Sequence, residues 1–314
     1  MKPSILIVGS SNTDMVIMAD HLPEPGETIL GGRFFMNAGG KGANQAVAAQ
    51  RLGGNVTFIC KTGTDIFGQQ AIRLFELEGI NTDYIISTPD YPSGVALITV
   101  DKNGENCIVV ASGANAMLIP SDLQNSKDVI IRSSIILMQL EIPVETVDFV
   151  ANMAKSSQSK IILNPAPACE LPSTLLQNTW MITPNEKEAE MLSGINITDV
   201  DSAIKAAKLI HAKGVVNVII TLGARGALLF NKEMCEFVSA PIVNAVDTTA
   251  AGDVFNGALA VALCENTGLL NAVRFACHAA SLSVTKPGAQ DSVPYRNEVD
   301  SFLKINNANA VIRK

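Results

Sequence analysis

The chain has 314 residues and a mass of 33.2 kDa, with 47% hydrophobic and 17% charged residues, so it can bury a sizeable core and is not expected to be disordered. Its net charge is −7 and its pI is about 5.1, which argues against nucleic acid or an anionic membrane as the main partner. The six cysteines lack CxxC spacing, and the apolar run near the N-terminus is too short for a signal peptide, so we expect a cytoplasmic protein with reduced thiols.

Short apolar runs alternate with helical patterns over most of the chain. Strands are predicted at 5–9, 56–60, 134–139, 160–163, 180–183 and 215–221, and helices at 44–52, 67–78, 143–156, 185–192, 200–211, 252–264 and 269–284. This order, with strands that are almost continuously apolar, predicts an α/β fold of three layers: a doubly wound, mainly parallel sheet with helices on both faces.

Two segments, 12–36 and 88–112, depart from this pattern and alternate as short strands do. Strands are predicted at 15–18, 27–30, 95–100 and 107–110, and Asn103-Gly104 predicts a hairpin turn between the last two. We expect these segments to form a small β-sheet lid over one end of an α/β domain built from 1–11, 37–87 and 113–314. A sheet this small does not stabilise itself, so the lid is also a candidate dimer contact.

The first candidate ligand-binding residues follow the first predicted strand. Asn12 and Asp14 are two residues apart, so their side chains point the same way and can bind adjacent hydroxyls, although turn-forming Asn and Asp are also common. The stretch 37–46 then carries three glycines that allow close approach to a ligand, with Lys41 and Asn44 able to donate to sugar hydroxyls. It lacks Walker A spacing, and a plain glycine-rich turn into a helix is the alternative.

Two further candidates lie near predicted strand ends. Glu141 follows the strand at 134–139, at the edge where α/β folds bind ligands. Asn185 and Glu188 are three apart at a helix start, so they share a face and can order a hydrated Mg²⁺ and phosphate oxygens. A structural capping pair explains the same two residues equally well.

Glycine-rich turns mark the last third of the chain. The turn 221–226 follows the strongest predicted strand and can present amides and the Thr221 hydroxyl to a nucleotide, or can be a plain hairpin turn into 227–230. The loop 285–292 is rich in carbonyl groups and turn residues, as loops that bind a monovalent cation are.

The most informative stretch is 247–259, in which Asp253 lies beside small residues that open an apolar helix. The amides of Ala250, Ala251 and Gly252 are expected to be free at the helix N-terminus, where an anionic group can approach them. An anion cradle next to a carboxylate base is what phosphoryl transfer to a hydroxyl needs, whereas an ordinary N-cap Asp is the structural alternative.

Taken together and in this order, these residues resemble the PfkB family of carbohydrate kinases, and most closely its ribose-phosphorylating members. The stretch 39–44, with Gly53 and Gly63 after it, is similar to the first family signature, and 247–253, continuing through 257–259, is similar to the second. The resemblance extends from Asn12 to Ser292.

The resemblance implies ATP-dependent phosphorylation of D-ribose at its primary hydroxyl to give D-ribose 5-phosphate. Asp253 is then the general base, and the turn formed by Ala250, Ala251, Gly252 and Asp253 is the anion hole. The implied sugar-binding residues are Asn12, Thr13, Asp14, Gly40, Lys41, Gly42, Ala43, Asn44, Glu141 and Asp253. The implied ATP-binding residues are Asn185, Thr221, Leu222, Gly223, Ala224, Arg225, Gly226, Gly252 and Cys277, with Glu188 placing Mg²⁺ through water. The positions implied around an activating K⁺ are Asp247, Thr249, Ser283, Lys286, Gly288 and Ser292.

The resemblance also implies a homodimer joined through the lid sheets. Cys277 departs from the pattern, since the resemblance places His or Asn near the adenine. Phosphorylation of 2-deoxyribose or fructose uses nearly the same residues and stays open. A sugar-binding regulator without catalysis is the alternative from another class, and a dinucleotide-dependent oxidoreductase is disfavoured because Gly9-Ser10-Ser11-Asn12 replaces the expected Gly-x-Gly-x-x-Gly.

Overall fold

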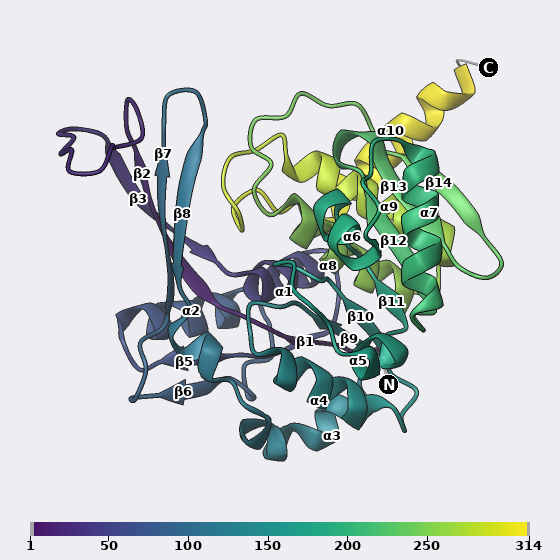
Figure 1. The fold of residues 1–314 in the computed structure, drawn as a ribbon, viewed down its shortest axis with the longest axis horizontal. Helices are drawn as coiled ribbons and strands as arrows, with labels where there is room; N and C mark the ends of the chain where they lie inside the picture. Colours follow the sequence, from purple (N-terminus) through teal and green to yellow (C-terminus); the bar gives the residue numbers. More distant parts are fainter. Residues whose placement is uncertain (1–2, 313–314) are drawn as a thin grey trace.

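A central sheet of eight strands separates two layers of helices in the computed structural model, which describes residues 3–312 (Figure 1). The strand order is β14-β13-β12-β11-β10-β9-β1-β4, parallel from β12 to β4, with β13 and β14 added as antiparallel strands. The strands are β1 (Ile5–Val8), β4 (Val56–Ile59), β9 (Ile135–Met138), β10 (Lys160–Leu163), β11 (Met181–Ile182), β12 (Asn217–Thr221), β13 (Gly226–Phe230) and β14 (Cys235–Ser239).

Both faces of this sheet are buried, which explains the continuously apolar strands. In β1, Ile5 and Ile7 pack into one core and Leu6 and Val8 into the other. The first core is covered by α1 (Lys41–Arg51), α8 (Ala251–Cys264), α9 (Leu269–Ser283) and α10 (Arg296–Ile312). The second is covered by α3 (Lys127–Arg132), α4 (Val144–Ala154), α5 (Ser173–Asn178), α6 (Glu186–Ser193) and α7 (Val200–Ala212). The three-layer, mainly parallel α/β fold is therefore confirmed.

A second sheet of four strands projects from one end of the α/β body (Figure 1). Its order is β3-β2-β7-β8, with β2 (Asn12–Met18), β3 (Arg33–Gly39), β7 (Gly94–Val100) and β8 (Asn106–Ala111). We refer to it as the lid sheet. At its base, α2 (Ile66–Leu77) packs next to a two-stranded sheet of β5 (Lys61–Gly63) and β6 (Ile86–Thr88). The division into domains at the boundaries given above stays a proposal.

The strand predicted at 27–30 is wrong. These residues are irregular and Leu30 is 91% exposed, whereas the strand that pairs with β2 is β3. Its last residues lie in the stretch that we predicted as a glycine-rich loop, and only Gly40, with a φ of 88°, separates the strand from the helix. The helix therefore begins at Lys41 rather than near Asn44, because a positive φ at a single glycine is enough to turn the chain.

The remaining predicted strands and helices are present, with ends shifted by a few residues. The alternative of a hairpin at 221–230 is also confirmed, since β12 and β13 pair antiparallel. Within the described residues, no helix combines the length and the apolar content that a membrane crossing needs.

Candidate active site

The candidate residues meet where the carboxyl ends of the parallel strands face the base of the lid sheet. Helices α1 and α8 lie side by side there (Figure 1). Their close approach depends on Gly257, because a Cβ at this position would lie 2.7 Å from the Cβ of Ala48. This packing brings the first turns of the two helices together. The first turn of α1 belongs to the glycine-rich stretch, and the first turn of α8 contains Asp253.

Asp253 is 6% exposed and lies in the first turn of α8. Asn44 Nδ2 donates to its Oδ2 at 3.0 Å, and Gln45 Nε2 donates to its Oδ1 at 3.0 Å. Burial raises the pKa of Asp253, while the positive charge of Lys41 and these two hydrogen bonds oppose the rise. The carboxylate is thus oriented at both oxygens, as a general base requires.

The turn before α8 has the shape of an anion cradle. Ala250 adopts the left-handed conformation with a φ of 59°, and the first helical hydrogen bond runs from the Val254 amide to the Ala250 carbonyl. The amides of Gly252 and Asp253 precede that bond and face the helix end. Ala251 departs from our prediction, because its amide donates to the Thr248 carbonyl at 3.3 Å. A Cβ on Gly252 would meet no described atom within 4 Å, so packing within the protein does not require a glycine there.

The residues predicted to bind sugar surround Asp253 from two elements. Asn12 and Asp14 lie on the same face of β2, and a Cβ on Gly39 would lie 2.2 Å from an Asp14 carboxylate oxygen. Thr13 lies between them and points to the other face of the lid sheet. Asn12 Oδ1 accepts a hydrogen bond of 2.7 Å from Asn115 Nδ2.

Glu141 fixes the start of α1. Its Oε2 accepts the Ser10 hydroxyl at 2.5 Å and the Lys41 amide at 2.9 Å. Ser10 also accepts two backbone amides: its hydroxyl oxygen accepts the Gly42 amide at 3.3 Å, and its carbonyl oxygen accepts the Ala43 amide at 2.9 Å. These two amides are therefore used within the protein, and Gly42 is needed because a Cβ there would lie 2.6 Å from the Ser10 nitrogen.

Acidic groups dominate the charge of this site. Burial raises the pKa of Asp14 to about 6, with Glu141 and Asp253 adding to the rise and Lys41 opposing it. Burial disfavours the charge on Lys41, but the nearby carboxylates outweigh the effect of burial and raise the pKa of the ammonium group. These carboxylates belong to Asp253, Glu141, Glu188 and Asp14. The lysine is therefore the positive group that balances the acidic ones.

Asp14→Asn is expected to stabilise the protein at pH 8 and to change its stability little at pH 4. The unfolded chain releases this proton near pH 3.8 and the folded chain near pH 6, so stability falls as pH rises through that window. The gain at pH 8 should be on the order of 1 kcal/mol. Thermal unfolding at both pH values measures it, with the exposed Asp20→Asn as control. Equal destabilisation at both pH values would contradict the charge argument.

The predicted nucleotide side lies at the ends of β11 and β12. Asn185 and Thr221 form a parallel bridge, and the Thr221 amide donates to the Pro184 carbonyl at 2.9 Å. The capping alternative for Asn185 and Glu188 is present, because each side chain accepts the other's backbone amide, at 2.9 and 2.8 Å. Burial raises the pKa of Glu188.

The turn after β12 divides into buried and open positions. Leu222 is buried and Arg225 pairs with Glu186, while Ala224 lies between Gly223 and Arg225 in a short 3₁₀ turn. Gly226 is required by packing, since a Cβ there would lie 2.0 Å from the Val238 carbonyl oxygen. A Cβ on Gly223 would meet nothing described within 4 Å. Cys277, on α9, is 4% exposed, and burial raises the pKa of its thiol to about 12.

The predicted cation loop is assembled from two segments. Asp247 accepts the Thr249 amide on Oδ1 and the Gly288 amide on Oδ2, both at 2.9 Å. Burial opposes its charge, but these hydrogen bonds outweigh burial and lower the pKa of Asp247.

Three other side chains predicted at this site have partners within the protein. Lys286 pairs with Glu298 at 2.8 Å, Ser283 donates to the Ala280 carbonyl at 2.9 Å, and Ser292 donates to the Ala289 carbonyl at 2.8 Å. Within the described chain, no group of three or more His, Cys, Asp or Glu side chains is arranged to hold a metal ion.

Sequence reasoning did not predict the hydrogen bonds among the buried amides beneath the site. Gln45 and Gln139 are fully buried, and Asn164 is 7% exposed. They are joined to each other and to Asp253 by hydrogen bonds that span 94 to 208 residues along the chain. The available signal was a glutamine between Asn44 and Ala46 on the buried side of a helix, and only the fold shows what it contacts.

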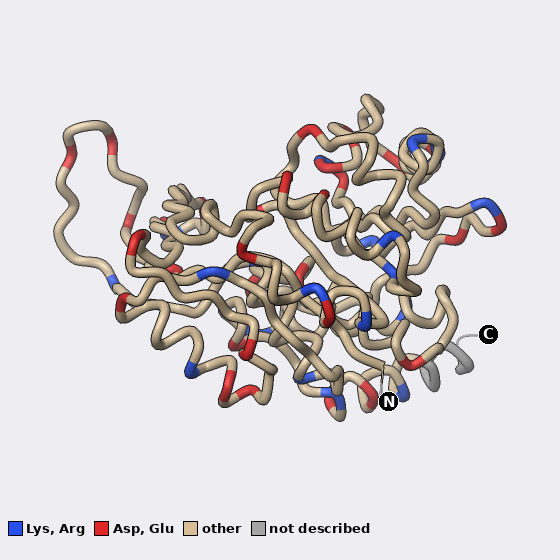
Figure 2. Tube along the Cα trace, turned by 90° about the horizontal axis from the view of Figure 1, so that it is seen from below, with Lys and Arg blue, Asp and Glu red and all other residues tan. Residues whose placement is uncertain are grey.

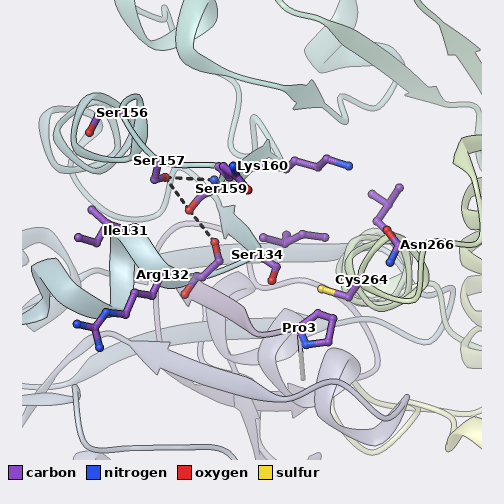
Figure 3. Close-up of a pocket in the computed structure, with 14 residues that line it drawn as sticks. Pro3, Ile131, Arg132, Ser134, Ser156, Ser157, Ser159, Lys160, Cys264 and Asn266 are labelled. Atoms are coloured by element: carbon purple, nitrogen blue, oxygen red, sulfur yellow. Dashed lines mark hydrogen bonds between the residues drawn. The ribbon is translucent and has the colours of Figure 1, made fainter. Parts of the chain in front are cut away.

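A cavity of about 540 Å³ lies at the opposite end of the sheet, where β9 and β10 begin (Figure 3). Serines on its wall donate to nearby carbonyl oxygens: Ser133 to Val129, Ser157 to Ala154 and Ser159 to Ser133, at 2.6 to 2.7 Å. These three hydroxyls are therefore used within the protein. A smaller cavity of about 170 Å³ lies between β2, β3 and α2, beside Asn12 and Gln290.

Known proteins are similar to this chain over nearly its whole length. The family model described as "pfkB family carbohydrate kinase" matches residues 2–296. A ribokinase of Haemophilus influenzae is 45% identical over 304 residues, covering 97% of this chain and 99% of that protein. A deoxyribokinase of Salmonella typhi is 37% identical, covering 96% of this chain and 99% of that protein.

Among solved structures, Arabidopsis thaliana ribokinase complexed with ribose and ATP has a TM-score of 0.92 and 33% identity. That similarity covers 97% of this chain and 99% of the plant protein.

Proposed function

The chain belongs to the pfkB family of carbohydrate kinases, and we propose that it transfers the γ-phosphoryl group of ATP to the primary hydroxyl of D-ribose, giving D-ribose 5-phosphate. The observation that carries this proposal is the position of Asp253, a buried carboxylate oriented at both oxygens in the first turn of α8. The ribokinases among its relatives, and the one solved with ribose and ATP, support the substrate pair.

The proposed reaction uses the two sides of the site in turn. Asn12, Asp14, Lys41 and Asn44 bind the sugar hydroxyls and direct the primary one toward Asp253. Asp253 accepts its proton as the oxygen attacks the γ-phosphorus. The amides of Gly252 and Asp253, at the positive end of α8, stabilise the charge that develops on the transferred group.

The cations are part of the proposal. Glu188 and Asn185 lie on the nucleotide side, where they would hold the hydration water of Mg²⁺, and the bound ion would neutralise phosphate charge. K⁺ would suit the loop around Asp247, whose ionised carboxylate joins the backbone of Thr249 to that of Gly288. Because the Thr248 carbonyl binds the Ala251 amide, a cation here would act directly on the turn that precedes α8.

The test is ADP release from purified protein with ATP·Mg²⁺ and ribose, 2-deoxyribose or fructose, each in potassium and in sodium buffer. We expect ribose to give the fastest turnover, and potassium to increase it. A clear preference for 2-deoxyribose would agree with the similarity to deoxyribokinase and reassign the sugar pocket. No turnover with any sugar would favour the regulator alternative.

The lid sheet supplies the proposed homodimer contact. On its face away from Asp14, five apolar side chains are 45% to 67% exposed: Ile17, Phe34, Met36, Leu97 and Val109. Its strands also carry few charges (Figure 2). An apolar sheet face of this kind is suited to pair with a second copy of the chain.

Leu97→Glu is therefore expected to convert the dimer to a monomer, because it places a charge at the centre of that face. Light scattering after size exclusion measures the mass, with the exposed Lys102→Glu in the same hairpin as control. A wild-type monomer, or a Leu97→Glu dimer, would contradict the proposed contact.

A further inference from the structure

A layer of buried amides lies directly beneath Asp253. Gln139 follows β9, Asn164 follows β10, and Gln45 projects from α1 between them. None of the three binds the sugar in the proposed reaction. Their contacts reach the reacting carboxylate only through Gln45.

The direction of each hydrogen bond in this layer is set by chemistry. Gln45 Nε2 donates to Asp253 Oδ1 at 3.0 Å and to Asn164 Oδ1 at 3.1 Å, so both of its protons are used. The Asn164 amide is fixed in turn, because its Nδ2 donates to the Thr183 carbonyl at 3.3 Å. An ionised carboxylate only accepts hydrogen bonds, so Gln45 must direct its nitrogen toward Asp253.

Gln139 keeps Gln45 in that orientation. Gln139 Nε2 donates to Gln45 Oε1 at 2.5 Å, so the Gln45 oxygen is held on the side away from Asp253. Gln139 Oε1, in contrast, has no hydrogen-bond partner among the described residues. Gly9 makes room for it, since a Cβ at Gly9 would lie 2.0 Å from this oxygen.

An unpartnered oxygen on a fully buried side chain is unfavourable and needs an explanation. A leucine or methionine at position 139 would fill the same space without that penalty. The glutamine is explained if its amide nitrogen has a function, and among the described residues that nitrogen donates only to Gln45. The cost of the unpartnered Gln139 oxygen is therefore offset by one contact, the hydrogen bond to Gln45 next to Asp253.

We propose that Gln139 is a positioning residue that acts through Gln45, holding the Gln45 amide with its nitrogen toward Asp253 so that the base stays ionised and aimed. This inference rests on the proposed function, in which Asp253 accepts the proton of the sugar hydroxyl. Without Gln139, the Gln45 oxygen loses its hydrogen-bond donor, so the orientation of the Gln45 amide toward Asp253 is held less firmly.

The charged groups around Asp253 explain why the loss of a single hydrogen-bond donor would change the pKa of this carboxylate. Asp14 from β2 and Glu141 from the end of β9 face it as like charges, and Glu188 from α6 adds to them. Lys41 is the cation among them, and Asn44 and Gln45 are the neutral donors. Loss of one donor therefore raises the pKa of Asp253 further.

The experiment measures the rate of phosphoryl transfer in single turnovers, as a function of pH, with saturating ribose and ATP·Mg²⁺. In Gln45→Met we expect the acidic limb of the pH–rate profile to move up by about one pH unit, the usual scale for a lost hydrogen bond to a charged group. In Gln139→Met we expect a smaller shift in the same direction, because Gln139 acts on Asp253 through Gln45. Most of the lost rate should return above the shifted limb, with ribose affinity little changed. Gln139→Glu should shift the limb further, because a carboxylate there attracts the Gln45 nitrogen away from Asp253.

The double variant separates positioning from general damage. If Gln139 acts through Gln45, adding Gln139→Met to Gln45→Met leaves the limb where Gln45→Met alone placed it. Gln50→Met, a glutamine on the same helix outside this layer, is the matched control and should keep the wild-type profile. Thermal unfolding of each variant shows that the protein compared is folded.

The outcomes are distinct from those of the proposed function. Absence of sugar-dependent turnover in the wild type contradicts the kinase proposal itself. An active wild type with an unshifted limb in Gln45→Met, or additive shifts in the double variant, overturns only the role of Gln139. A rate loss that is equal at all pH values would also overturn it, because structural damage has no pH signature.

Discussion

Asp253→Asn is expected to lower kcat by roughly 10²- to 10⁴-fold, the usual scale for loss of a general base. Asparagine has nearly the same shape but cannot accept the proton of the sugar hydroxyl. The KM for ribose should stay near the wild-type value, because the other sugar-binding residues are unchanged. Both parameters come from ribose-dependent ADP release.

The control for this variant is Asp128→Asn, an exposed acid on α3 with 76% of its side chain accessible. It should behave as wild type. The Asp253 variant should also remain folded, which thermal unfolding checks. A kcat within a few-fold of wild type in folded Asp253→Asn would remove this residue from the mechanism.

Asn44→Ala is expected to raise the KM for ribose by roughly 10- to 100-fold, which corresponds to loss of a hydrogen bond in a buried polar site. The sequence alone predicted an effect mainly on sugar affinity. The structure adds a second consequence, because Asn44 Nδ2 also donates to Asp253 Oδ2 at 3.0 Å. The variant should therefore lower kcat as well and move the acidic limb of the rate to higher pH.

The Asn44 experiment compares ribose KM, ATP KM and kcat with those of Asn55→Ala, a change of an exposed asparagine that follows the same helix. The control should leave all three parameters unchanged. An effect confined to the KM for ATP would place Asn44 at the wrong end of the site.

The fold was predictable where periodicity is strong. The parallel strands are buried on both faces and the long helices are amphipathic, so the spacing of their apolar residues predicts which segments are strands and which are helices. The lid strand β3 was missed because its second half reads as a glycine-rich loop, and pairing with β2 over seven residues overrides that local signal. The short strands β5 and β6 have three residues each, too few for any period to show.

The site was predictable where it is local in sequence. The residues around Asp253 and the glycine-rich stretch at 39–44 carry recognisable signatures, and the structure brings them together through the contact of α1 and α8. The contact of Gln45 with Gln139 joins residues 94 positions apart and depends on strand order and amide orientation. Neither property is visible before the chain is folded.

For the residues around Asn185, the sequence could not decide between two roles. Sequence reasoning offered a capping pair and a magnesium ligand pair as alternatives, and the structure contains the capping pair. The two uses are compatible, because Glu188 keeps a lone pair on each oxygen while it accepts the Asn185 amide. The role in holding Mg²⁺ stays a proposal.

The central claim is transfer of phosphate from ATP to the primary hydroxyl of ribose with Asp253 as the base. The most direct measurement is NMR of the product formed from ATP·Mg²⁺ and ribose labelled with ¹³C at C5, using wild type and Asp253→Asn at equal concentration. We predict phosphorus coupling to the labelled carbon in the wild-type product, and almost no product from the variant. Phosphate on another carbon, no phosphorylated sugar, or equal product from both proteins would contradict the claim.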